Sequence, residues 1–179
     1  MLGAAMVALL AGGCGGGGPD DSDVVRGRGL TPIPLSAEAE AAVYDAAARA
    51  SFDFGPDLVL MAHPRRLPRT AGYGGGDMLP PALLRALRER GLVQGSCDPQ
   101  HAAPLDTPRC GGVQPGYIIR GSTIVRVVAD TIQLNFAAET FAPAAGQRPQ
   151  ALRFEKIYQL VGSGTTWRVV REARVREPR

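Results

Sequence analysis

Cysteine and histidine are the side chains of this chain best suited to chemistry. Cys97 and Cys110 flank a proline-rich loop, and in an oxidising compartment such a pair forms a disulfide. Closing a loop of about 14 residues stabilises a fold by about 3 kcal/mol in the chain-entropy model. His101 lies in the same loop and is a candidate third ligand of a metal site. The pair lacks the Cys-x-x-Cys spacing and a second nearby histidine, so we expect a disulfide and no bound metal.

Motifs for catalysis are missing from the sequence. No serine lies in a Gly-x-Ser-x-Gly motif, and no His-Glu-x-x-His, calcium-loop or dinucleotide pattern occurs. His63 precedes a proline and is interpreted as a loop histidine, as is His101. Asp53 and Asp57 flank a Gly-Pro pair, where turn formation explains them better than acid–base catalysis. We predict no catalytic residue and no cofactor, and a non-catalytic role is the better hypothesis.

A glycine-rich segment over 71–77 follows an apolar run over 57–63 and precedes an expected helix. A strand, a glycine-rich loop and a helix in this order cradle phosphate in nucleotide-binding folds. The P-loop pattern needs a lysine on the phosphates, whereas Asp77 stands here and would repel them. The segment is therefore interpreted as a surface loop.

The composition indicates a single folded domain with a short extension. Of 179 residues, 45% are hydrophobic and 21% charged, which allows a real core and argues against wholesale disorder. No apolar run reaches the roughly 20 residues of a membrane-spanning helix. The net charge is +3, but the C-terminal arginines alternate with glutamates, as on an ordinary solvated surface. We therefore expect no nucleic-acid partner.

Helical spacing of small apolar residues predicts an amphipathic helix over 37–51, with Ser36 as its N-cap. Two prolines open a second predicted helix over 81–90, and Gly91 is a plausible C-cap. Alternating or apolar segments predict strands over 57–63, 117–120, 123–129, 131–140, 151–161 and 166–175. The predicted fold is α+β over 36–179, with N-terminal helices packed on a curved antiparallel sheet of about four strands.

The expected strand over 131–140 has hydrophobic residues at every second position, which is typical of a strand buried on one face. In the last expected strand, Trp167, Val169, Ala173 and Val175 share one parity, and Arg171 interrupts the row and suggests a bulge or a strand end. We predict that Trp167 packs in the core, over the alanine face of the first helix.

The N-terminus carries an apolar, small-residue run over 2–13, then Cys14, four glycines, a proline and two aspartates. This pattern resembles the lipobox of bacterial lipoproteins, where the cysteine is lipidated and becomes the mature N-terminus. The resemblance implies a signal peptide over 1–13, a lipidated Cys14 and a flexible tether over 14–35. It further implies a location at the bacterial cell envelope, facing the periplasm or the exterior, with the membrane as a partner through the lipid.

The closing hairpin, over 158–170, is similar to the last hairpin of NTF2-like and cystatin-like domains, in which a curved sheet wraps N-terminal helices. Two function classes follow. The first is a small envelope lipoprotein without catalysis, which binds or assembles with an envelope protein. The second is an NTF2-like ligand-binding or enzymatic pocket, with Tyr117, Tyr158, Asp77 and Arg153 as candidate lining residues. A deep, partly polar cavity between helix and sheet would favour the second class, and a filled core the first.

Overall fold

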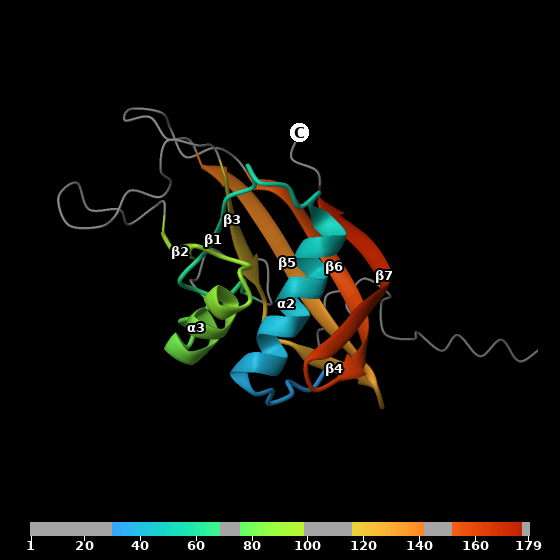
Figure 1. Ribbon diagram of the computed structural model, residues 1–179. Coiled ribbons are helices and arrows are strands. Elements are labelled where there is room, and N and C mark those ends of the chain that lie inside the picture. Colours follow the sequence, from blue (N-terminus) through green and yellow to red (C-terminus); the bar gives the residue numbers. More distant parts are fainter. Residues whose placement is uncertain (1–29, 69–75, 99–115, 142–151, 177–179) are drawn as a thin grey trace, which may run out of the picture.

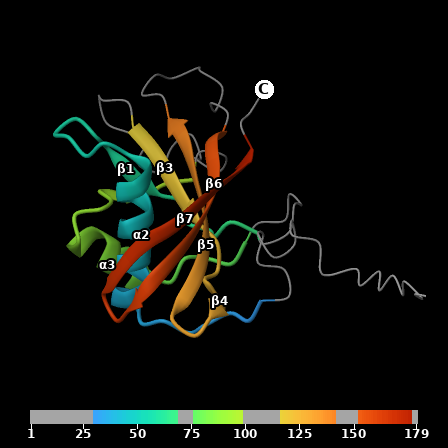
Figure 2. The ribbon, with the colours of Figure 1, turned by 90° about the vertical axis from the view of Figure 1, so that its right-hand side faces the viewer.

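Figure 1 shows the computed structural model, which describes residues 30–68, 76–98, 116–141 and 152–176. In these residues two helices cover one face of a seven-stranded sheet. The helices are α2 (Ala37–Ser51) and α3 (Pro81–Glu89). The strands are β1 (Leu60–Ala62), β2 (Gly95–Ser96), β3 (Gly116–Gly121), β4 (Val125–Val128), β5 (Thr131–Phe141), β6 (Leu152–Ser163) and β7 (Thr166–Arg176). Figure 2 shows the helices and the sheet as two layers.

Both helices begin and end close to the residues that the sequence predicts. Ser36 caps α2 by accepting a hydrogen bond from the Ala39 N–H at 3.2 Å. A proline opens α3, and Gly91 follows it with a positive φ of 67°, the left-handed conformation that glycine adopts most easily. Neither helix in the described residues is long and apolar enough to cross a membrane.

The sheet is mixed. Its strand order is β2-β1-β3-β5-β6-β7, and β4 pairs with β5 beside the end of β3. β1 runs parallel to both β2 and β3. The other pairs, which are β3 with β5, β4 with β5, β5 with β6 and β6 with β7, are antiparallel. The predicted fold, N-terminal helices on an antiparallel sheet of about four strands, is therefore wrong.

The error has a physical cause. Parallel neighbouring strands need a crossover connection, and α3 provides the one between β1 and β2. This helix therefore lies between strands in the sequence and does not precede the whole sheet, as the prediction assumed. β2 has two residues and thus no alternation that a sequence pattern could reveal. The partners of β1 lie some 30 to 60 positions along the chain and depend on the tertiary fold.

The core lies between the helices and the sheet. The alanine face of α2 packs against alternate residues of β5 and β6, among them Leu134, Phe136 and Tyr158, all with 0% exposure. The opposite face of β5 is buried too, because Gln133 and Asn135 are 1% and 7% exposed. The prediction that only one face of this strand is buried is therefore wrong.

β7 contains the suggested bulge. Val169 pairs with Leu160, but the next pair joins Arg171 to Gln159, so Val170 is the extra residue. Beyond it the faces exchange: Ala173 pairs with Ile157, on the side away from the helices. Ala173 thus does not share a face with Trp167 and Val169. Trp167 is partly buried against the core and its indole N–H donates to the Gly164 carbonyl at 2.9 Å.

Residues just before α2 already contact the sheet. Pro32 bridges to Val125 of β4, and the Ile33 N–H donates to the Ile124 carbonyl at 3.2 Å. Ile33 and Leu35 also pack against the core. The segment that the sequence assigned to the end of a tether therefore meets the folded domain over 31–35.

Candidate functional site

A cluster of charged side chains lies at the carboxyl ends of the three parallel strands. His63 follows β1, Asp98 follows β2, and Arg120 lies near the end of β3, next to His63 in the β1–β3 register. Glu139 on β5 pairs with Ile118 of β3. Side chains alternate between the faces of a sheet, so His63, Arg120 and Glu139 lie on the face opposite α2, as does a small apolar cluster of Val59, Met61, Cys97 and Ile118. Asp98 lies beyond the end of β2 and comes within 3.8 Å of His63. In open sheets the carboxyl ends of parallel strands are where ligands most often bind, which makes this cluster the first candidate site.

His63 is buried, with 7% exposure. Its Nδ1 lies 3.0 Å from both the N–H and the carbonyl oxygen of Arg65 and accepts from the N–H. Its Nε2 faces the Asp98 carboxylate at 3.8 Å, which is a charge contact longer than a hydrogen bond. Burial, and after it the charge of Arg120, lowers the pKa of His63 to about 4. At neutral pH the ring is therefore uncharged and held in place.

Arg120 and Glu139 complete the cluster. The Arg120 Nε donates to the Arg65 carbonyl at 2.9 Å. Burial lowers the pKa of Arg120 and raises that of Glu139, while their mutual attraction opposes both shifts. Two acidic and two basic side chains, counting Arg65, thus surround a neutral histidine. The charges balance, so the cluster carries no net field that would attract an anion or a cation.

The geometry argues against catalysis at this cluster. A histidine that acts as a general base needs one free nitrogen directed at a nucleophile or water. Here Nδ1 is bonded to the Arg65 backbone and Nε2 faces the Asp98 carboxylate, and among the described residues no serine, threonine or cysteine side chain hydrogen-bonds to His63. The same residues contain no group of three or more His, Cys, Asp or Glu side chains that could hold a metal ion.

The other face of the sheet carries a buried ion pair and a buried phenol. Arg66 forms a two-pronged ion pair with Glu40 of α2, with both side chains 12–13% exposed. Tyr44, one turn further along α2, is 2% exposed, and its hydroxyl has no hydrogen-bond partner among the described residues. Burial, and after it the negative charge of Glu40, raises the pKa of the Tyr44 hydroxyl well above its usual range. These contacts join α2 to the segment after β1 and leave the interior of the helix–sheet interface filled.

Of the four residues proposed to line a pocket, the three whose side chains the structure describes have other surroundings. Tyr158 is fully buried and shares a 2.7 Å hydrogen bond with the Ser51 hydroxyl. Tyr117 stacks on Phe52 at 5.0 Å between ring centroids, in a continuous aromatic cluster that also includes Phe136, Phe154 and Tyr158. Asp77 is exposed on the hairpin after β1, where its carbonyl accepts the Arg66 N–H. The Arg153 side chain lies outside the described part of the chain.

The cysteines are only partly described. Cys97 is buried, at 5% exposure, and disulfide-bonded. Cys14 and Cys110 lie outside the described residues, as does His101, so the pairing of Cys97 with Cys110 stays a prediction. The sequence reasoning missed the His63–Asp98 contact. The only sign of this contact in the sequence is a histidine directly after an apolar strand. Asp98 comes 35 positions later, after a strand of two residues that is too short to be recognised from its sequence.

Comparisons of this chain with protein-family models, with curated proteins and with solved structures find no match.

Proposed function

We propose that this chain is an exported bacterial lipoprotein, anchored by lipid on Cys14, whose folded domain binds or assembles with another component of the cell envelope and has no catalytic activity. The observation that carries the non-catalytic assignment is the burial of His63, whose Nδ1 is already bonded to the Arg65 N–H. This burial disfavours acid–base chemistry at the histidine of the charged cluster.

Two features support export and anchoring. The apolar run before Cys14 and the glycines after it have the order of a lipoprotein signal. The disulfide at Cys97 fits an oxidising compartment, because disulfides rarely persist in the cytosol. Fifteen residues lie between Cys14 and Leu30 and would span at most about 50 Å when extended, enough to hold the domain near a membrane surface.

The NTF2-like alternative requires a cavity between the helix and the curved sheet. That space holds Tyr44, Phe136 and Tyr158, each no more than 2% exposed, and Tyr44 contacts Phe136 edge-on at 6.3 Å between centroids. A ligand would have to displace these rings. The filled interior favours the binding or assembly role over a pocket enzyme.

Membrane fractionation tests the anchor. The full-length gene is expressed in its native host with a clickable palmitate analogue, as wild type and as Cys14→Ala. We expect the wild type to be labelled and to sediment with membranes, and Cys14→Ala to be unlabelled and soluble. Cys110→Ala is the control and should keep both label and membrane association. An unlabelled wild type, or a Cys14→Ala protein that still sediments, contradicts the assignment.

A further inference from the structure

β7 forms one edge of the sheet. It is the last strand in the order and, among the described elements, pairs only with β6. Figure 2 faces this edge and shows β7 running along it with no helix or strand in front. The strand has 11 residues. Along such an edge, alternate backbone N–H and C=O groups point away from the sheet and are available to another strand.

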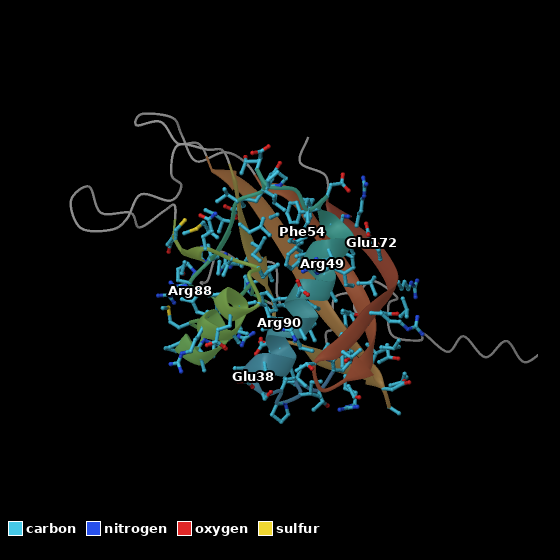
Figure 3. The ribbon with its side chains drawn as sticks, in the orientation of Figure 1. Glu38, Arg49, Phe54, Arg88, Arg90 and Glu172 are labelled. Carbon is cyan, nitrogen blue, oxygen red and sulfur yellow. The ribbon has the colours of Figure 1, made fainter. Side chains whose placement is uncertain are left out.

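Three of the six exposed side chains described on this strand are arginines. Arg168 and Arg171 are exposed and make no hydrogen bond or ion pair with the described residues. Arg174 is exposed as well. The one acidic residue of the strand, Glu172 (Figure 3), is paired with Lys156 of β6 at 2.8 Å. Through Arg168 and Arg171 the edge therefore offers positive charge that the described domain does not neutralise.

The edge is held rigidly. Trp167 and Val169 pack against the core below α2. Arg90, at the end of α3, bridges the layers: its guanidinium lies 3.9 Å from the Asp45 carboxylate of α2 and donates to the Thr165 carbonyl in the β6–β7 turn at 3.5 Å. Arg49 stacks on Phe54 at 4.8 Å, and both lie at the C-terminal end of α2 (Figure 3). A strand that is already ordered loses little entropy when a partner adds to it.

We propose that the β7 edge binds an acidic, extended peptide segment of a partner protein, which adds to the sheet as a further strand. Main-chain hydrogen bonds to β7 would supply affinity, and Arg168 and Arg171 would select acidic side chains. This inference rests on the proposed binding role and names the surface and the chemistry of the partner.

A second copy of this chain fits the edge poorly. Antiparallel pairing of two β7 strands would bring rows of arginine together, and like charges opposite one another destabilise a sheet. The bulge at Val170 also bends the strand, which disfavours a long, regular pairing with an identical edge. An acidic strand meets neither obstacle. Its charge is opposite to that of the arginines, and it can pair with a short stretch of β7 on one side of the bulge.

The start of β7 also borders a depression. Its volume is about 480 Å³, and it is lined by Asp130, Val161, Gly162, Ser163, Thr166, Trp167 and Arg168. It is large enough for side chains of an added strand, and Arg168 lies on its wall. Recognition of the partner would thus combine the edge with this depression.

The binding test uses the full chain with Cys14→Ala, oxidised, so that it does not depend on lipidation. The probe is a synthetic ten-residue peptide in which Glu alternates with Thr and Val, and the control peptide has Lys in place of Glu. We expect the Glu peptide to bind, with an affinity that falls as salt is raised, and the Lys peptide not to bind. The double variant Arg168→Glu, Arg171→Glu should bind the Glu peptide about tenfold more weakly or not at all. Arg85→Glu with Arg88→Glu on α3 makes the same change in net charge elsewhere and should bind as the unsubstituted chain does.

Amide hydrogen exchange separates strand addition from simple charge attraction. On binding, outward-facing amides over 166–176 should become protected, while amides of α3 should not change. Binding without this protection, equal loss in both double variants, or no binding overturns the proposal. Anionic vesicles form a further arm: if they bind the chain through Arg168 and Arg171 while the peptide does not, the surface contacts lipid and the proposal is wrong. The Cys14 fractionation result is independent of each of these outcomes.

Discussion

Two buried tyrosines differ in one respect that can be measured. Tyr44 and Tyr158 are 2% and 0% exposed and belong to the same core. The Tyr158 hydroxyl shares a hydrogen bond with Ser51, whereas the Tyr44 hydroxyl makes no hydrogen bond of regular geometry with the described residues. Its polar neighbour is the Gly121 backbone, which only partly offsets the effect of burial on its pKa. A buried polar group without a hydrogen bond costs about 1–3 kcal/mol. Removing that group should therefore stabilise the protein.

We predict opposite signs for the same substitution at the two sites. Tyr44→Phe should raise the free energy of unfolding by about 1 kcal/mol, because it removes an unsatisfied hydroxyl. Tyr158→Phe should lower it by about 1 kcal/mol, because it breaks a satisfied bond. For a chain of this size the difference of about 2 kcal/mol separates the two melting temperatures by about 4–8 °C. Thermal and urea unfolding of the oxidised chain measure both values.

The comparison controls for the loss of the oxygen atom itself, since each variant replaces tyrosine by phenylalanine in a fully buried site. Ser51→Ala serves as a second control: it should destabilise the wild type but have little effect in Tyr158→Phe. If Tyr44→Phe is as destabilising as Tyr158→Phe, the Tyr44 hydroxyl has a partner, and the reasoning about this contact is refuted.

Two further predictions concern the other face of the sheet. Burial lowers the pKa of His63 from 6.5 in the unfolded chain to about 4 in the folded one. As the pH falls, the unfolded chain therefore binds the proton first. The contribution of the neutral His63 to the free energy of unfolding is complete above pH 6.5 and is lost as the pH falls towards 4. Between pH 7 and about 5.5 the wild type should lose about 1 kcal/mol more than His63→Gln in urea unfolding, and equal losses would contradict the buried neutral state. Peptide mapping without reduction should link Cys97 to Cys110, and Cys97→Ser should cost about 3 kcal/mol in thermal unfolding. A link from Cys97 to Cys14 would refute both the pairing and the lipid anchor.

Local structure follows closely from neighbouring residues. The predicted helix over 37–51 is α2 with the same bounds, because Ser36, the acidic first turn and the alanine spacing all act within a few positions. The long strands β5, β6 and β7 also lie within one or two residues of the predicted ranges, because apolar residues recur at alternate positions along most of each strand. Even the bulge had a local signal, the arginine that interrupts the apolar row of β7.

Only the tertiary structure decided which strands pair and which faces are covered. β1 joins β2 and β3 through parallel pairing over long separations, which leaves no trace in a short window of sequence. Gln133 and Asn135 are polar and yet buried, although they lie on the face of β5 that points away from the helices. The His63–Asp98 contact exists only because that pairing brings two strand ends together. Capping and alternation are short-range properties and can be recognised in the sequence, whereas pairing and burial are properties of the whole chain.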